Sequence, residues 1–386
     1  MRVFLAATSL LFEYGGPAVS ISRLASTLAD AGAEVGLWAA DQSAATTTLV
    51  SDNSRLQRLN GTAIEALERF SEVDVLHDNG IWLSHHHRLA LLARSRGIPR
   101  IVSTRGMLEP WALNHKQIKK RIAWMLYQKR DLQQAHCHIA TGEVEARNLK
   151  RLKLGIPIAT IPNGVDMPGE LPCKARIKLG TAVREGQKTA LFLGRIYPVK
   201  GLPMLVEAWS RVRPDGWILR IAGPDEAGHR KEVERAVSSA GLSDTVIFTG
   251  PIDPHMKKDV FFDADLFVLP SHSESFGMAV AEALAHGVPV LTTTGTPWSI
   301  LKEKGCGWWM GATVDGLTEG LRQATKLNTE VLQAMGMKGR VLVAAEFGWK
   351  HIADVMLSTY AKVLAQSSDR TVSGIPQPVS VSNRET

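Results

Sequence analysis

Short apolar runs alternate with helix-like segments along most of the chain, and this alternation limits the fold more than any other feature. In the first half the runs are VFLAAT, EVGLWAA, VDVLH, RIVST and CHIATG, at residues 3–8, 34–40, 73–77, 100–104 and 137–142. Runs of this length separated by helical patterns are typical of βαβ units, whose strands pair in parallel. The first half therefore predicts a parallel sheet covered by helices.

The series breaks once and then restarts. Residues 158–172, IATIPNGVDMPGELP, are rich in Pro, Gly and Asn, as expected where a chain leaves one domain and enters another. Strand-like runs then return at residues 189–195, 217–223, 245–250, 264–271 and 288–293. Because 386 residues also exceed what one core usually holds, we predict an α/β protein of two doubly wound, Rossmann-like domains, residues 1–165 and 166–348, facing each other across a cleft.

The end of the chain divides into two parts. Residues 349–365 carry apolar side chains at helical spacing and predict a separate helix. Residues 366–386 are polar and poor in core-forming side chains, so we predict a disordered tail there.

Charge and cysteine content narrow the functional classes. The chain has 45 Lys and Arg against 38 Asp and Glu, and this excess suits an anionic ligand or an anionic membrane surface without indicating nucleic acid. Cys137, Cys173 and Cys306 lie far apart and imply neither a disulfide framework nor a zinc site. No apolar run is long enough to span a bilayer, so we expect a cytoplasmic protein.

The carboxyl ends of parallel strands are where ligands usually bind, and two of these ends attract attention first. After the first strand, Gly15 and Gly16 precede a helix start and could offer amides to an anion or a sugar, although a simple tight turn explains them equally well. After residues 189–193, Gly194, Arg195 and Lys200 lie in a glycine- and proline-containing turn. Arg and Lys at a strand end favour an anion site over two solvated charges.

A third strand end carries the segment SESFGMAVAEALAHGVPVL, residues 273–291. A turn at 273–277 leads into a short predicted helix that Gly287 and Pro289 end. Amides near Gly277 and Met278 would then face the same crevice as the cations above, ready for a diphosphate. Glu274 and Glu282 flank these amides and can accept hydrogen bonds from hydroxyl groups, which is what the hexose and ribose of a nucleotide sugar present. The alternative is one Glu satisfied by backbone amides and one at a helix start.

The sequence resembles the family 4 retaining glycosyltransferases, which have the GT-B fold. The resemblance depends on GRIYPVKG at 194–201, ESFGMAVAE at 274–282 and IPNGVD at 161–166, and it covers residues 1–365. It implies that residues 349–365 cross back to the first domain. It also implies transfer with retention of anomeric configuration, assisted by the donor phosphate and without an essential catalytic base.

The resemblance assigns roles to the residues at the strand ends. Arg195 and Lys200 would bind the donor diphosphate, Glu282 the ribose, and Glu274 the transferred hexose. The remaining donor-side contacts would come from Gly15, Gly16, Gly194, Phe276, Gly277 and Met278. Many family members have His before Gly near the donor sugar, where this chain has Arg105 before Gly106. Arg105 could replace a polar contact of that His.

Residues that could contact an acceptor lie in the first domain. His77, Asp78 and Asn79 end a predicted strand and could contact an acceptor or merely cap a turn. Residues 116–130, KQIKKRIAWMLYQKR, form a basic amphipathic helix that suits docking on anionic lipid or, alternatively, a core-facing helix with a solvated basic side.

Two patterns that could suggest a metal site are better explained otherwise. Neighbouring side chains on a helix point apart, so His85, His86 and His87 are interpreted as a surface run. Asp263 and Asp265 precede a strand, the wrong end for a metal-diphosphate site, and we predict no metal and no cofactor.

The function expected from these observations is a retaining glycosyltransferase. It would move a hexose from a UDP- or GDP-sugar to a lipid-linked or growing glycan of a bacterial surface polysaccharide, such as lipopolysaccharide or exopolysaccharide. The enzyme would contact the inner face of the plasma membrane peripherally. A non-catalytic nucleotide- or sugar-binding module of the same fold is an alternative. A nicotinamide-dependent oxidoreductase is a weaker one, since the chain lacks GxGxxG with a ribose-binding acid.

Overall fold

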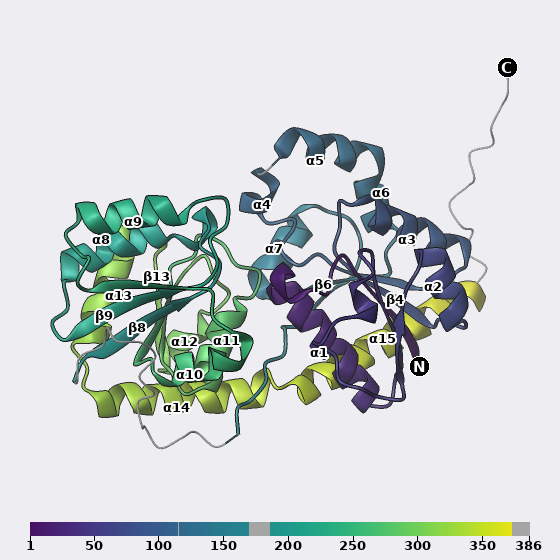
Figure 1. Ribbon diagram of the computed structural model, residues 1–386. Helices are drawn as coiled ribbons and strands as arrows, with labels where there is room; N and C mark the ends of the chain where they lie inside the picture. Colours follow the sequence, from purple (N-terminus) through teal and green to yellow (C-terminus); the bar gives the residue numbers. More distant parts are fainter. Residues whose placement is uncertain (115, 170–185, 373–386) are drawn as a thin grey trace.

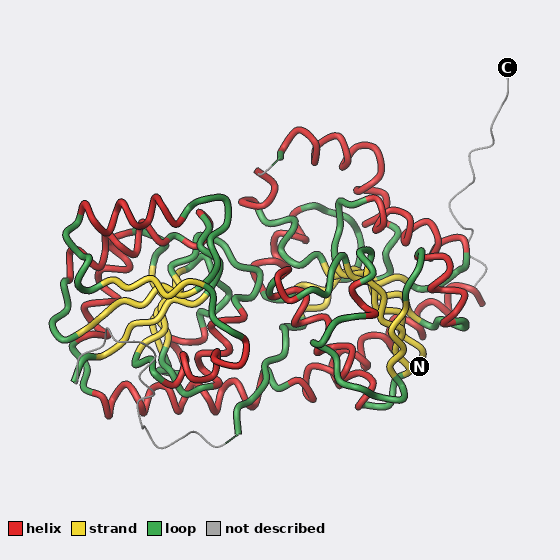
Figure 2. Tube along the Cα trace, viewed as in Figure 1, coloured by secondary structure: helices red, strands yellow, loops and turns green. Residues whose placement is uncertain are grey.

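The computed structural model describes residues 1–114, 116–169 and 186–372, and it contains two parallel sheets with helices on both faces (Figure 1). The first sheet has the strand order β3-β2-β1-β4-β5-β6-β7 and the second the order β10-β9-β8-β11-β12-β13. Figure 2 shows the strands as two separate groups, each enclosed by helices. The predicted architecture of two doubly wound α/β units is confirmed.

The first unit alternates strands and helices from the start of the chain. Its strands are β1 Arg2–Ala7, β2 Glu34–Ala39, β3 Leu56–Leu59, β4 Val75–Asn79, β5 Arg100–Ser103, β6 Cys137–Ala140 and β7 Ile158–Thr160. Its helices are α1 Gly16–Asp30, α2 Ala63–Phe70, α3 Ser84–Ser95, α4 Pro110–Asn114, α5 Gln117–Ala123, α6 Lys129–Gln133 and α7 Glu143–Arg151. Short turns of other helix types are η1 Phe12–Tyr14, η2 Ser43–Ala45 and the π-helical η3 Trp124–Gln128.

The second unit repeats the pattern. Its strands are β8 Lys188–Leu193, β9 Trp217–Ala222, β10 Val246–Gly250, β11 Leu266–Leu269, β12 Val290–Thr293 and β13 Gly307–Met310. Its helices are α8 Leu202–Val212, α9 Arg230–Ser239, α10 Lys257–Phe262, α11 Met278–Ala285, α12 Ile300–Glu303, α13 Val314–Thr325 and α14 Thr329–Glu346, with 3₁₀ turns η4 Pro198–Lys200 and η5 Pro254–Met256.

Central strands are buried on both faces, which explains why they appear in the sequence as continuous apolar runs. Val3 to Ala7 of β1 are fully buried, and Val3 pairs with Val35 of β2 on one side and Val75 of β4 on the other. Helices α1 and α15 cover one face of this sheet, where Ile21 and Leu24 of α1 share a core with Ile352 and Met356.

Helix α15, Trp349–Val372, leaves the second unit and packs on the first. Figure 1 shows it continuing from α14 beneath the first sheet. The predicted disordered tail from residue 366 is wrong in its first part, since residues 366–372 extend this helix. Polar side chains such as Ser367, whose hydroxyl donates to the carbonyl of Val363, do not interrupt a helix that is already formed. The rest of the predicted tail, 373–386, lies outside the described residues.

The strand order changes direction between β1 and β4 in the first sheet and between β8 and β11 in the second. In open parallel sheets, ligands bind beyond the carboxyl ends of the strands at such switch points. The loops that follow these four strands are therefore the parts of the chain where a site is expected.

Candidate functional site

Lys200 and Glu274 form an ion pair at the switch point of the second sheet. Lys200 ends the 3₁₀ turn after β8, Glu274 lies in the loop after β11, and the Lys200 Nζ to Glu274 Oε1 distance is 2.5 Å. Their side chains are only 16% and 14% exposed. The hydroxyl of Ser271 donates to the same carboxylate oxygen at 2.7 Å. The sequence prediction that the two loops share one crevice agrees with this geometry.

The loops fit together because Gly201 has no side chain. Its φ is +68°, and a Cβ atom there would collide with the carbonyl oxygen of Pro270. The amide of His272 also donates to the carbonyl of Val199 at 2.8 Å. These backbone contacts fix Lys200 against the loop that carries Glu274.

Helix α11 begins beside this ion pair with Gly277 as its N-cap, in the left-handed conformation at φ +83°. The first backbone bond of the helix runs from the amide of Val280 to the carbonyl of Gly277, so the amides before Val280 have no intrahelical acceptor. Phe276 is buried against Trp298 and Phe347, and the Trp298 indole donates to the Phe276 carbonyl at 2.6 Å. This packing fixes a helix N-terminus, which attracts anions.

Arg195 and Glu282 each have a partner of opposite charge nearby. Arg195 is half exposed and lies 2.5 Å from Glu226, whereas Glu282 is 17% exposed and lies 2.5 Å from Lys257. Gly194 precedes Arg195 directly and is held by its amide, which donates to the carbonyl of Ala222 at 3.0 Å. Roles for these residues toward a donor stay predictions.

The first unit contacts the loop of Glu274 through two glycines, Gly16 and Gly106, and through Thr141. A Cβ atom on Gly16 would lie 3.7 Å from Met278, so the start of α1 meets the start of α11. Ser275 packs against Gly106, where a Cβ atom would come within 2.8 Å of the Ser275 Cβ. The hydroxyl of Thr141 donates to the Ser275 carbonyl at 3.0 Å. The carboxyl ends of the two sheets therefore meet at residues 275–278.

Arg105 connects three parts of the first unit. Its guanidinium donates to Asn79 Oδ1 at 2.6 Å, to Asn163 Oδ1 at 2.7 Å and to the Ser20 hydroxyl at 3.1 Å. Burial lowers the pKa of Arg105 to about 10, so the side chain still carries its charge. Its φ of +52° is unusual for a residue with a side chain. The proposed contact of Arg105 with a donor sugar is untested, and its contacts here are with the protein.

The prediction that His77 and Asp78 contact an acceptor is wrong for this structure. Strand β4 continues to Asn79, both side chains are fully buried, and Asn79 is 3% exposed. His77 bonds to Tyr360 of α15 at 2.6 Å and to Ser103 at 2.7 Å, and burial lowers its pKa to about 3. Polar residues at the end of an apolar run looked like a loop because the sequence does not show these buried partners.

The interpretation of the three histidines as a surface run is also wrong. His86 is 2% exposed and lies 2.6 Å from the fully buried carboxylate of Asp78. Arg100 pairs with the other Asp78 oxygen at 2.8 Å, and His87 pairs with Asp131 at 2.8 Å. The rings of His85 and His86 also do not point apart as predicted, since their centroids are 4.0 Å apart and both contact the Thr8 hydroxyl.

Asp263 and Asp265 have structural partners before β11. Asp263 pairs with Arg220 at 2.7 Å, and Asp265 accepts the amide of Thr189 at 2.9 Å. Across the described ranges, no group of His, Cys, Asp and Glu side chains has the arrangement of a metal site.

Glu109 and Glu145 are two buried carboxylates that sequence reasoning missed. Glu145 accepts hydrogen bonds from Thr104, the Gly106 amide and Thr141, and so shapes the loop that touches Ser275. Glu109 is 5% exposed, and one of its oxygens has no partner while the other accepts from Asn148 at 2.6 Å. Burial, followed by the charge of Glu145, raises the pKa of Glu109 to about 7.

The raised pKa gives a prediction for stability against pH. Between the ordinary pKa and about 7 the folded state binds more protons at Glu109 than the unfolded state, so this residue removes stability as pH rises through that window. Glu109→Gln should therefore stabilise the protein at pH 8 by on the order of 1 to 3 kcal/mol and have little effect at pH 5. Denaturant unfolding at both pH values measures this; equal effects at both would contradict it.

Residues 117–130 form one continuous helical stretch, α5, η3 and the start of α6, with an exposed apolar face. Ile118, Ile122, Met125 and Leu126 are 76%, 49%, 79% and 75% exposed. The alternative of a core-facing helix is therefore wrong. We call these four side chains the apolar face of the basic helix. No helix in the described parts of the chain is both long enough and apolar enough to cross a membrane.

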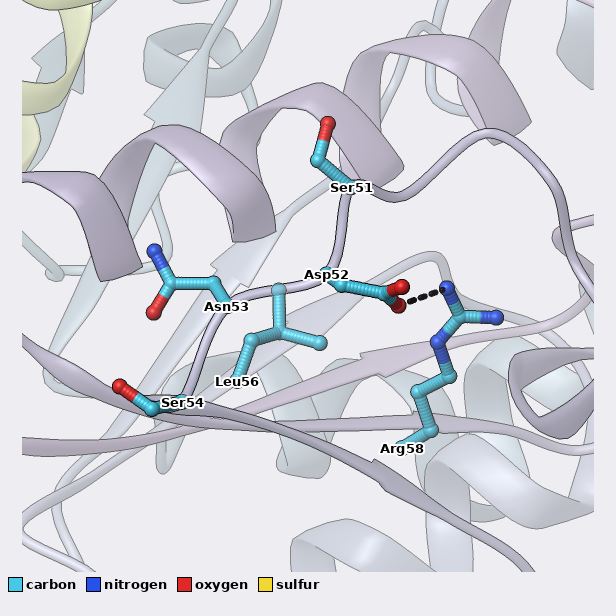
Figure 3. Close-up of a pocket in the computed structure, with 6 residues that line it drawn as sticks. All are labelled: Ser51, Asp52, Asn53, Ser54, Leu56 and Arg58. Atoms are coloured by element: carbon cyan, nitrogen blue, oxygen red, sulfur yellow. Dashed lines mark ion pairs between the residues drawn. The ribbon is translucent and has the colours of Figure 1, made fainter.

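A shallow cavity of about 400 Å³ lies far along the chain from these groups. It is lined by Ser51, Asp52, Asn53, Ser54, Leu56 and Arg58, at edge strand β3 and the loop before it (Figure 3). Arg58 reaches Asp52 at 3.5 Å and also donates to two backbone carbonyls of its own loop. None of the predicted site residues lines this cavity. We therefore interpret it as a depression formed by the path of the surface loop before β3, and not as a ligand site.

Comparison with known proteins identifies the family of this chain. The family model "Glycosyl transferases group 1" matches residues 173–341, and the model "Glycosyl transferase 4-like domain" matches residues 15–164. A D-inositol 3-phosphate glycosyltransferase of Nocardia farcinica is 30% identical over 310 residues, which are 75% of this chain and 67% of that protein. The chain belongs to the family 4 glycosyltransferases.

Solved structures place this glycosyltransferase in the GT-B fold. Sucrose-phosphate synthase from Thermosynechococcus elongatus aligns with a TM-score of 0.77 at 20% identity, over 95% of this chain and 100% of that one. Anabaena HepE in complex with UDP and glucose aligns with a TM-score of 0.73 at 18% identity, over 94% and 100%. The predicted family and fold are confirmed.

Proposed function

We propose that this glycosyltransferase moves a hexose from a UDP- or GDP-sugar to an acceptor with retention of anomeric configuration. The observation that carries the proposal is the Lys200–Glu274 pair beside the N-terminus of α11, at the switch point of the second sheet. It combines a cation and free amides, which suit a diphosphate, with a carboxylate, which suits sugar hydroxyls. The complex of the structural neighbour HepE with UDP and glucose supports a UDP-sugar.

In this proposal each charged group acts on one part of the donor. Lys200, Arg195 and the amides of Gly277 and Met278 bind the diphosphate, and stabilise the charge that develops when the bond to the sugar breaks. Glu274 orients the hexose, and Glu282 accepts hydrogen bonds from the ribose. The leaving phosphate takes the proton of the acceptor hydroxyl on the same face of the sugar.

The acceptor in this proposal is a lipid-linked or growing glycan of a bacterial surface polysaccharide, reached from the cytoplasmic side of the membrane. The apolar face of the basic helix supports it, because the helix exposes four large apolar side chains within a segment of six Lys or Arg and no acid. Such a helix binds anionic lipid by combining apolar burial with charge attraction.

A donor screen tests the proposal. UDP-, GDP- and ADP-sugars are added singly, and the melting temperature of the protein is measured. A ligand that binds only the folded state at 100 times its Kd adds about 2.7 kcal/mol to stability. We expect a UDP- or GDP-sugar to raise the melting temperature. Stabilisation by ADP-sugars alone, or by none of them, would contradict the donor assignment.

The Arg195–Glu226 pair gives a second prediction. Glu226 competes with the donor diphosphate for Arg195, so Glu226→Gln should tighten donor binding. Half-exposed pairs of this kind are worth about 0.2 to 1 kcal/mol, which corresponds to a Kd lower by about 1.4-fold to fivefold. Calorimetric titration measures the Kd, with Glu234→Gln, whose carboxylate pairs with Arg230 instead, as the control. Weaker binding by Glu226→Gln would exclude competition.

A further inference from the structure

Helix α4 of the first unit contacts the loop after β8, which carries two cations of the proposed donor site. The centroids of the Trp111 and Tyr197 rings lie 5.8 Å apart, and the ring planes meet at 80°. Aromatic pairs favour this edge-to-face arrangement. Tyr197 lies between Arg195 and Lys200 in the sequence. The pair therefore joins the two units within the loop that is proposed to bind the diphosphate.

Trp111 contributes little to the core of its own unit. It is 37% exposed, and it lies outside the three hydrophobic clusters that the described residues of the first unit form. Trp82 and Trp124, by contrast, pack against one of these clusters. Large aromatic side chains that stay partly exposed are typical of interfaces. The interface with Tyr197 thus explains the position of Trp111 better than packing within the first unit does.

Both rings are carried by backbone that hydrogen bonds hold in place. In the first unit, Lys120 Nζ donates to the carbonyl of Ala112, the neighbour of Trp111, at 2.5 Å. In the second unit, the amide of Lys200 donates to the carbonyl of Tyr197 at 2.9 Å, so the ring and the cation share one turn. Because each support is fixed within its own unit, contact between the rings depends on how the two units are placed relative to each other.

The two chain segments that cross between the units are joined to each other. The amide of Val165 donates to the carbonyl of Phe347 at 2.8 Å, and Gly164 packs against the Trp349 ring. Figure 1 shows α14 and α15 running along one side of both units and α4 on the opposite side. Rotation about the crossing segments would move α4 more than it moves residues near those segments, since displacement grows with distance from a hinge. Opening of the units would therefore separate the two rings.

We propose that Trp111 and Tyr197 form a latch that holds the two units closed around a bound donor. Trp111 is then a positioning residue and does not touch the sugar. The inference rests on the proposed donor site, because the closed latch holds the first unit against the loop of Arg195 and Lys200. An edge-to-face pair shifts an equilibrium between open and closed forms by roughly twofold to 13-fold. A shift of this size favours closure over a bound donor and still allows the units to open for product release.

The contact between the rings can be tested without any substrate. The chain has four tyrosines, so full-length protein labelled with 3-fluorotyrosine gives four ¹⁹F signals, and Tyr197→Phe identifies that of Tyr197. Trp111→Leu removes the ring current of the indole and should shift the Tyr197 signal, whereas the signal of buried Tyr360 should stay in place. Trp111→Phe keeps an aromatic ring and should shift the Tyr197 signal less. An unmoved Tyr197 signal in folded Trp111→Leu would overturn the latch.

The effect of the latch on donor binding is measured with UDP-glucose. Trp111→Leu and Tyr197→Leu should each raise the Kd about twofold to 13-fold. The double variant should bind no more weakly than the weaker single variant, because both changes remove the same contact. Leu91→Ala, which shortens an exposed side chain of α3, is the control and should match the wild type.

Two outcomes would count against the latch. An unchanged Kd in Trp111→Leu excludes it, and fully additive effects show that the two side chains act separately. Absence of UDP-glucose binding by the wild type would instead contradict the donor proposal, and the ¹⁹F signal of Tyr197 would still decide whether Trp111 holds the units in contact.

Discussion

Replacing Lys200 by methionine is expected to lower kcat/KM for sugar transfer by about 10²- to 10³-fold, the usual cost of removing a group that stabilises developing charge. Lys200 is only 16% exposed, so solvent screens its charge poorly. The variant also leaves the Glu274 carboxylate without its cation next to the diphosphate, and like charges repel there. Initial rates at varied donor concentration, with circular dichroism to verify folding, measure the effect.

A variant of the partner residue, Glu274→Gln, distinguishes donor binding from the catalytic step. Glu274→Gln leaves Lys200 free for phosphate, so donor affinity should be kept or increase while kcat falls, whereas Lys200→Met should weaken donor binding as well. Lys231→Met, an exposed lysine on α9, is the control and should behave as the wild type. Wild-type transfer by folded Lys200→Met would refute the site.

The sequence predicted the meeting of Lys200 and Glu274 for a general reason. Both follow strands of one parallel sheet, and the carboxyl ends of neighbouring strands lie along the same edge. The direct ion pair could not be predicted, since 74 residues separate the two and side-chain contacts at that distance depend on loop shape. The glycine at 201 was visible in the sequence, but its close approach to Pro270 was not.

The wrong sequence predictions in the first unit have one cause. His77, Asp78 and His86 were placed near the surface because polar side chains usually lie there, yet each has buried partners from distant parts of the chain. Tyr360, the partner of His77, lies 283 residues away on α15. Periodicity predicts elements from local sequence, and it does not identify such partners. The run of three histidines soon after β4 and Gly80 is the signal that could have located the switch point.

The apolar face of the basic helix is expected to bind the protein to anionic membranes. Changing Ile118, Met125 and Leu126 together to serine removes three side chains that are each about three-quarters exposed and have few protein contacts to lose. Complete burial of such a side chain is worth about 1.5 to 3 kcal/mol, and an interfacial helix buries about half of it, so the triple variant should partition onto anionic vesicles about 100-fold less.

Sedimentation with phosphatidylcholine vesicles containing 30% phosphatidylglycerol, a mixture of roughly physiological charge, measures this partitioning. The control exchanges Val331, Met337 and Val341 of α14 for serine, because these are also exposed apolar side chains but lie outside the basic helix. Vesicle binding by the wild type should weaken as salt is added, because salt screens the six cations. The apolar contribution to binding should depend less on salt. If both triple variants bind as the wild type does, the helix has another role. If only the basic-helix variant loses binding, the first unit contacts lipid through this helix, as the proposed lipid-linked acceptor requires.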